Sequence, residues 1–391
     1  MMHHRPRAIT CLATGLVAAS AAAPGAIAAS GNFMLIRRDV PVQIVEVAEI
    51  GPQFLVFRED GGGWTSVSRR QCVALLKLDA VVVPRVQGWL RLADGQRFPG
   101  QAMSGAPVAD GVFVWSQSSW LGRMHVPLDR VASVTLSGGA TVPSPGEADV
   151  LVLANGDRVE GFVTALGDPI SLEVSNDDGD RTVFDLPLGR VRAVRMVTPE
   201  QKPIGNRLWL IDGTIVDVQR VMLGDDGFYR LEGVPFAGEA PGRIGLDTVA
   251  AVLFDPNALV GFSSLVPRRV EGPPTRYVVP PPVALDDHAP LSLSRVEFRG
   301  PVTAHYVLPA GATYFAAEAQ LPETARAWGD CLLKVRNGDR EVFSERLNAE
   351  TPTASIGVRL TGSTLTIEVA EGSAGPIQNR VILLRGLILV E

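Results

Sequence analysis

The side chains that could perform catalysis are few and widely separated. The histidines are residues 3, 4, 125, 288 and 305, and the chain lacks the serine-hydrolase, zinc-protease, phosphate-loop and C-x-x-C motifs. A general base needs an orienting partner and a proton within hydrogen-bonding distance. His125, His288 and His305 are expected in separate parts of the fold, where they would lack such partners. We therefore predict no catalytic residue and no enzymatic activity.

Acidic pairs could instead cleave a glycoside or bind a metal ion. Glycoside cleavage needs two carboxylates about 5 to 9.5 Å apart, and Asp177-Asp178 and Asp225-Asp226 are the obvious pairs. Both lie beside glycine in apparent turns, which Asp favours for backbone reasons alone. The stretch 176–180 is rich in oxygen ligands but lacks the 12-residue spacing and final Glu of a calcium loop. We expect solvated turns, no metal and no cofactor, and keep a glycosidase only as a third alternative.

Tryptophans offer a different chemistry, because the C–H face of a sugar ring stacks on an indole. Trp328 lies in a predicted loop two residues after Arg326, and Trp115 and Trp120 flank a polar turn. Core packing and cross-strand pairing are the alternative roles for such aromatic residues. The four candidate ligand-binding residues are therefore Trp328, Arg326, Trp115 and Trp120.

A repeat organises the first two thirds of the chain. Leucine-rich segments run into an acidic or amide residue at positions 39, 94, 155 and 212, which are 55, 61 and 57 residues apart. Each copy closes on an apolar–polar alternation. Such a period predicts an array of similar small modules. We place the four repeats at 33–84, 85–140, 148–200 and 205–256.

Within each repeat, the pattern is that of short β-strands. Apolar residues alternate with polar ones, and Asp-Gly and Asn-Gly pairs mark tight hairpins. Five strands in about 55 residues bury little area as an open sheet, whereas closure removes the exposed edges. We predict small closed barrels of the SH3 or Sm type. Because such modules are individually marginal, neighbours should pack together.

The remainder of the chain changes pattern at residue 257. Residues 257–289 are proline-rich and are expected to form a semi-rigid linker with a strand or two laid along a neighbour. Residues 290–391 contain about eight longer strands and no helical periodicity, which predicts a jelly-roll sandwich. The fold class is therefore all-β, with tandem barrel-like repeats followed by a sandwich.

The last hundred residues resemble the bacterial NPCBM family, a carbohydrate-binding module of β-sandwich fold. The matching stretches are Pro290–Leu293, Ala304–Pro309, Thr313–Ala319, Gly329–Asp339 and Leu360–Val369. The resemblance covers about a quarter of the chain and implies a noncatalytic module that accompanies glycan-active or surface proteins. The family has an acidic residue and a tryptophan near its last strand, where this chain has Asn379-Arg380-Val381-Ile382. No calcium or sugar site is therefore carried over, and the repeats resemble no named enzyme family.

Composition and the N-terminus indicate where the protein works. The net charge is −6 and no cluster of basic residues is larger than a pair, which argues against nucleic acid as a partner. Arg5, Arg7, the apolar stretch 8–23 and Ala26-Ile27-Ala28 predict a signal peptide over 1–28, with an uncleaved membrane anchor as the alternative. No later segment is apolar enough to span a membrane, so we expect a secreted, periplasmic or cell-surface protein.

These inferences favour an exported, noncatalytic binding or scaffolding protein. Its terminal module would recognise a glycan or a surface protein, while the repeats would act as a spacer and interaction surface. A structural protein that self-associates in the cell envelope is the alternative, and the sequence leaves the oligomeric state open. Cys72 and Cys331 are too few for a disulfide framework and are expected as buried free thiols.

Overall fold

The computed structural model describes residues 32–391, apart from 41, 85–87, 104–110, 118, 138, 145, 176–178, 237–241, 274–277, 287, 374 and 376–377. The predicted signal peptide and the acidic residues 176–178 lie outside the described residues. Strands form almost all of the regular structure, which confirms the all-β class. The helices in the described part are 3₁₀ turns of three residues, and none is long and apolar enough to cross a bilayer.

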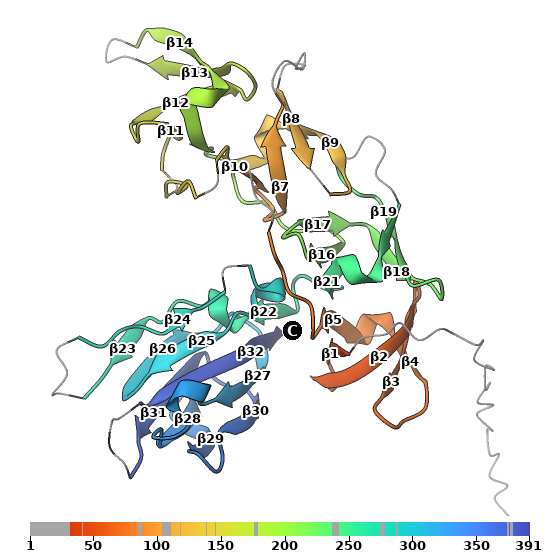
Figure 1. Cartoon of the computed structure of the whole chain (residues 1–391), viewed down its shortest axis with the longest axis vertical. Coiled ribbons are helices and arrows are strands. Elements are labelled where there is room, and N and C mark those ends of the chain that lie inside the picture. The colour runs from red at the N-terminus through yellow and green to blue at the C-terminus, as the bar shows by residue number, and fades with distance from the viewer. Residues whose placement is uncertain are drawn as a thin grey trace, which may run out of the picture.

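Each of the four repeats forms one module of short antiparallel strands (Figure 1). Module 1 contains β1 (Phe33–Arg37), β2 (Gln43–Ile50), β3 (Phe54–Glu59), β4 (Thr65–Ser68) and β5 (Cys72–Lys77). Module 2 contains β6 (Gly88–Leu92), β7 (Arg97–Ala102), β8 (Val112–Gln117), β9 (Gly122–Pro127) and β10 (Val131–Thr135). Module 3 contains β11 (Asp149–Leu153), β12 (Arg158–Ala165), β13 (Ile170–Ser175), β14 (Arg181–Leu186) and β15 (Val191–Arg195). Module 4 contains β16 (Asn206–Leu210), β17 (Ile215–Val218), β18 (Arg220–Leu223), β19 (Phe228–Glu232), β20 (Arg243–Gly245) and β21 (Val249–Leu253).

The repeated Asp/Asn-Gly pair forms the first hairpin of modules 2, 3 and 4. The side-chain oxygens of Asp94, Asn155 and Asp212 accept the backbone N–H two residues later, at 3.1, 3.1 and 2.8 Å. The glycine that follows has a φ of 85°, 93° and 88° in turn, which a side chain would strain. The Asp/Asn-Gly pair, which is the most recognisable part of the repeat, therefore stabilises a backbone turn.

Each module curls without closing into a barrel, and the apolar residues inside the four modules form one connected core. The first strand pairs with both the second and the last, and a 3₁₀ turn joins the penultimate strand to the last. Among the described residues, the penultimate strand pairs with the strand before it and not with the last strand of its module. The prediction of closed barrels is corrected here, because the modules cover their last strands by pairing with each other.

The last strands join the modules in two pairs. In modules 1 and 4, β5 lies antiparallel to β21, with Leu75 opposite Val252. In modules 2 and 3, β10 lies antiparallel to β15, with Val134 opposite Val194. Single contacts of β7 with β17 and of β2 with β18 complete a continuous sheet of 21 strands. Modules adjacent in space are therefore not always adjacent in sequence.

Residues 290–391 form the predicted jelly roll of eight strands. The strands are β25 (Val296–Arg299), β26 (Val302–Val307), β27 (Ala312–Gln320), β28 (Cys331–Asn337), β29 (Arg340–Leu347), β30 (Thr353–Arg359), β31 (Thr364–Glu371) and β32 (Arg380–Val390). One sheet has the order β25-β32-β27-β30 and the other the order β26-β31-β28-β29. Their inner faces enclose one apolar core that includes Phe298, Phe315 and Leu333.

The proline-rich segment contributes three short strands to this sandwich. β22 (Leu259–Gly261) pairs with the end of β32, and β24 (Val283–Ala284) pairs with β25. β23 (Arg269–Glu271) extends the opposite sheet beside β26. The sequence predicted one or two strands laid along a neighbour, and the structure has three. Cys72 and Cys331 are buried free thiols, as predicted, and burial raises the pKa of Cys72 to about 11.

A second apolar layer attaches the sandwich to modules 1 and 4. The strands β1, β5 and β21 are buried along their whole length, so both of their faces are covered. Phe33 and Leu35 point into module 1, whereas Met34 and Ile36 pack in the layer that contains Leu387 and Leu389 of β32. Unbroken apolar strands are expected where both faces of a sheet are buried.

We predict that Ile36→Ala lowers the free energy of unfolding by about 2–5 kcal/mol, because it leaves a cavity in this layer. Val81→Ala is the matched control, since Val81 is 72% exposed and should change stability little. Urea unfolding monitored by tryptophan fluorescence measures both. Equal midpoints for the two variants would contradict a packed interface at Ile36.

Candidate functional site

Trp328 is the one tryptophan of the six that projects into solvent. It is 70% exposed, whereas Trp115 is fully buried and Trp209 is 8% exposed. It ends a turn between β27 and β28 that includes η7 (Glu323–Ala325). The buried side chains of Leu321 and Ala325 anchor this turn in the sandwich. The indole is therefore available for contact on a segment fixed from beneath.

Backbone hydrogen bonds hold the turn in shape. The N–H groups of Trp328 and Gly329 both donate to the carbonyl of Ala325, at 3.2 and 2.6 Å. A Cβ at Gly329 would lie 2.7 Å from that same carbonyl oxygen, so the close approach requires glycine. Arg326 is exposed, and its Nε–H donates to the carbonyl of Leu321 at 3.5 Å. The predicted residues Arg326 and Trp328 therefore share one ordered turn.

Asp330 connects this turn to its neighbours. Its carboxylate accepts two hydrogen bonds from Arg346, at 2.7 and 2.8 Å, and one from the Ser373 hydroxyl at 2.8 Å. Asn379 is buried nearby, and its Nδ2 donates to the carbonyl of Gly375. Its Oδ1 is buried and has no partner among the described residues. Sequence reasoning identified Asn379 only as a departure from the family pattern.

The other two predicted tryptophans do not join this site. Trp115 lies in the core of module 2, with its ring centroid 5.8 Å from that of Phe113, and neither of its faces is open to a sugar. We therefore remove Trp115 from the binding residues. Trp120 is half-buried against the module core, and its backbone N–H donates to Gln117 Oε1 at 3.0 Å. Trp120 therefore stays a predicted binding residue, separate from the turn of Trp328.

The remaining candidate groups have structural partners. Asp226 accepts hydrogen bonds from Arg230 and Arg243 at 3.0 and 2.9 Å, and the bond from Arg230 lowers the pKa of its carboxyl. His305 contacts Thr366 and Glu271. The part of the chain that the structure describes contains no cluster of three or more His, Cys, Asp or Glu suited to a metal ion.

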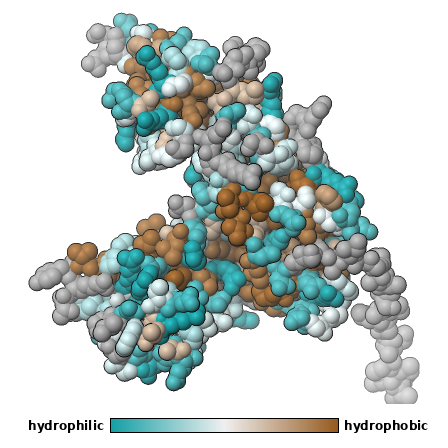
Figure 2. Space-filling model, viewed as in Figure 1, coloured by the Kyte–Doolittle hydropathy of each residue, from teal (hydrophilic) through white to brown (hydrophobic). Residues whose placement is uncertain are grey.

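A cavity of about 770 Å³ lies where modules 2, 3 and 4 meet the start of the sandwich. Figure 2 shows the molecule hollowed between the lobe that carries modules 2 and 3 and the sandwich. The polar lining includes Arg91, Ser133 and Arg195, and the apolar lining includes Trp209 and Leu259. Its size is that of small-molecule sites. Sequence reasoning missed it because its lining comes from segments up to 200 residues apart.

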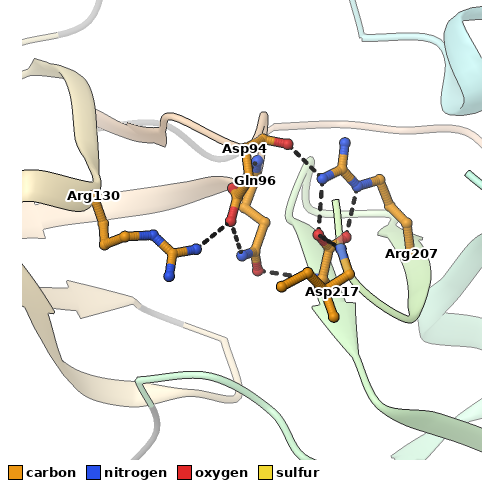
Figure 3. A network of polar contacts seen from close by, with 6 residues as sticks. Asp94, Gln96, Arg130, Arg207 and Asp217 are labelled. Atoms are coloured by element: carbon orange, nitrogen blue, oxygen red, sulfur yellow. Dashed lines mark hydrogen bonds and ion pairs between the residues drawn. The ribbon is translucent and has the colours of Figure 1, made fainter. Parts of the chain in front are cut away.

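One wall of the cavity is held by the polar network in Figure 3. Asp94 accepts hydrogen bonds from Arg130 at 2.6 Å and from Gln96 Nε2 at 2.9 Å. Gln96 Oε1 in turn accepts the backbone N–H of Asp217 at 2.9 Å. Arg207 binds both carboxylate oxygens of Asp217 and donates to the backbone carbonyl of Asp94 at 2.6 Å. The network thus joins module 2 to module 4.

Arg97 joins the same two modules to the segment before the sandwich. It donates to the carbonyl of Gly213 at 3.1 Å and to His288 Nδ1 at 2.9 Å. Its guanidinium lies 4.6 Å from the ring centroid of Trp89. Burial, together with the charge of Arg91, lowers the pKa of Arg97 to about 10. The contacts of Arg97 with Gly213, His288 and Trp89 therefore stabilise this wall of the cavity.

The opposite wall carries two consecutive residues in an unusual conformation. Leu291 and Ser292 have φ values of 57° and 54°, in the left-handed region that favours glycine. Gly261 packs directly beneath, where a Cβ would lie 2.1 Å from the Ser292 carbonyl oxygen. Packing against β22 therefore fixes the strained segment, as is common beside binding sites.

Comparison with known proteins does not assign a family. No family model matches the chain, and no curated protein matches it. Among solved structures, CBM51 from Clostridium perfringens GH95 in complex with methyl-galactose is 12% identical, covering 33% of this chain and 99% of that chain, with a TM-score of 0.28. The tandem CBM51 modules of Sp3GH98, the family 98 glycoside hydrolase from Streptococcus pneumoniae, are 11% identical, covering 62% and 88%, with a TM-score of 0.28. The Bacillus thuringiensis delta-endotoxin Cry8Ea1 is 13% identical, covering 80% and 55%, with a TM-score of 0.23. Scores this low do not establish a shared fold.

We predict that Asp217→Ala lowers the free energy of unfolding by about 3–5 kcal/mol, because it leaves the Arg207 charge buried without its partner. Glu232→Ala is the control, since it breaks the exposed pair with Arg220 and should cost less than about 1 kcal/mol. Thermal or urea unfolding compares the two. Equal losses would contradict the structural importance of the Asp94–Asp217 network.

Proposed function

We propose that the protein is a noncatalytic binding protein whose terminal sandwich recognises a glycan through Trp328. The observation that carries this proposal is a 70% exposed indole on a hydrogen-bonded turn with buried anchors. A large aromatic side chain left in water at a loop tip gains free energy when a ligand covers it. Loops on a rigid scaffold are common positions for binding residues.

The order of the turn favours binding. A segment that is already fixed loses little conformational entropy when a ligand binds to it. Arg326 lies two residues away and is exposed, so its guanidinium N–H groups are available to hydroxyl or carboxylate oxygens at the edge of a stacked sugar. The unpartnered Oδ1 of Asn379 adds a buried acceptor at the same end of the sandwich.

The wider setting of this function is part of the same proposal. The resemblance of residues 290–391 to the NPCBM family implies an accessory module of glycan-active or surface proteins. Export through the predicted signal peptide would bring such a module outside the cytoplasm, where glycans are exposed. The four modules would then hold the sandwich at a distance and in a fixed orientation.

We predict that Trp328→Ala weakens glycan binding at least tenfold, or about 1.4 kcal/mol, because the stacking surface is lost. Phe162→Ala is the matched control, since Phe162 is a 65% exposed aromatic residue of module 3, far along the chain. A glycan array with the full chain would identify the sugar, and titration calorimetry would compare the variants.

Two results would contradict this proposal. One is an array, covering neutral and acidic glycans, to which the wild-type chain does not bind. The other is equal affinity of the wild-type and Trp328→Ala proteins for the sugar identified. Retention of an envelope protein in place of a polysaccharide in a pull-down with the full chain would assign the sandwich to protein recognition.

Self-association is the second candidate function, and the edge strand β14 favours it. Val183 and Phe184 on this strand are 57% and 49% exposed, and one edge of β14 has no partner strand among the described residues. An antiparallel pairing of two copies centred on Val183 would place Arg181 opposite Asp185 of the other copy. Such opposite-charge pairs stabilise neighbouring strands, and unprotected edges invite pairing between chains.

We predict that the chain then dimerises with increasing concentration and that Val183→Lys abolishes this dimer, because charge on an edge strand opposes pairing. Val278→Lys is the control, since Val278 is exposed in the proline-rich segment. Sedimentation velocity across concentration distinguishes the species. A wild-type chain that stays monomeric up to about 100 μM would contradict self-association.

A further inference from the structure

The two module pairs have corresponding outer faces that differ in polarity. In modules 1 and 4, the outward positions of the paired strands are occupied by Ile36, Ala74, Leu76, Trp209, Ala251 and Leu253, which lie in the apolar layer against the sandwich. In modules 2 and 3, the same repeat positions carry Arg91, Ser133, Thr135, Val152, Ala193 and Arg195. Arg91, Ser133 and Arg195 of this second face line the cavity, next to Trp209 and Leu253 of the first face.

The two arginines lie in one row across this face. Ser133 of β10 is directly opposite Arg91 of β6 on one side and Arg195 of β15 on the other. Directly opposite residues project to the same face of a sheet. Strand spacing separates the outer two backbones by about 10 Å, so their long side chains can reach a common group above Ser133.

Neither arginine of this row is neutralised. Among the described residues, Arg91 and Arg195 have no ion pair and no side-chain hydrogen bond. The Nε of Arg195 is buried without an acceptor, which costs free energy. Arg97 and Arg207, which also line the cavity, are already committed to His288 and Asp217.

We propose that this cavity is an anion-binding site, and that its ligand is the carboxylate or sulfate group of an acidic oligosaccharide. The planar guanidinium groups of Arg91 and Arg195 match such oxyanions in geometry and charge, and the Ser133 hydroxyl adds a donor between them. The apolar side chains of Trp209 and Leu259 face the carbon skeleton of the same ligand. The site is separate from Trp328 and goes beyond the sugar stacking proposed there.

The test is titration calorimetry of the full chain at low salt with three probes. The probes are an α-1,4-linked galacturonate hexamer, a neutral galactose oligomer of the same length, and sodium sulfate. We expect the acidic hexamer to bind and the neutral oligomer to bind at least tenfold more weakly at this site. Added sodium chloride should lower the affinity for the acidic hexamer. Failure of both the hexamer and sulfate to bind would overturn the proposal.

Variants then assign the binding to the row of arginines. Arg91→Ala/Arg195→Ala should weaken binding of the acidic hexamer at the cavity at least tenfold. Arg192→Ala is the matched control, because Arg192 is exposed on the same strand β15 but does not line the cavity. Equal affinity of the double variant and the wild type would overturn the site.

The probes and variants also distinguish this site from the glycan site proposed at Trp328. Loss of hexamer binding only in Trp328→Ala would overturn the cavity site and support the sandwich. Sulfate binding that the double variant abolishes, without binding of the hexamer, supports the anion site and assigns it to free oxyanions. Thermal unfolding of the double variant should occur at no lower temperature than that of the wild type, because neither arginine has a partner to lose.

Discussion

The antiparallel pairing of last strands between modules is the constraint on which the rest of the structure depends. Each module curls without closing and leaves its last strand open on one side. Pairing β5 with β21 and β10 with β15 satisfies those edges, as closure would have done. Because module 1 pairs with module 4, and module 2 with module 3, the chain returns on itself and forms a folded-back array.

The same pairing creates two outer faces, of which one packs against the sandwich and the other borders the cavity. The face of modules 1 and 4 is apolar and receives the β32 side of the sandwich, so the sandwich is held by burial of apolar surface. The face of modules 2 and 3 keeps arginines at corresponding positions and remains open to the cavity. Divergence at a few repeated positions is sufficient to turn a packing surface into a charged wall.

Much of the fold was predictable from residue patterns. In the sandwich, about eight long strands were expected, because long alternating segments such as those of β28 and β31 define both the strand and its buried face. Barrel closure was not predictable, since a curled sheet and a closed one have the same alternation. The unbroken apolar run Phe33–Ile36 was the available signal that both faces of β1 are covered.

The candidate sites also differ in how far they could be predicted from the sequence. The exposure of Trp328 was predictable because an aromatic residue in a polar loop is recognisable locally, whereas Trp115 beside a polar turn has the same local pattern and yet points into the core. The Arg91–Ser133–Arg195 row needed the pairing of three strands from two modules, which no single segment encodes.

Hydrogen exchange followed by mass spectrometry, resolved to individual strands of the full chain, tests the pairing of modules most directly. Paired central strands should exchange slowly, so we predict that β5, β10, β15 and β21 are among the most protected strands and that the edge strand β14 exchanges rapidly. Exchange of β5 and β21 as fast as that of β14 would mean that the modules are independent units, and would contradict the account.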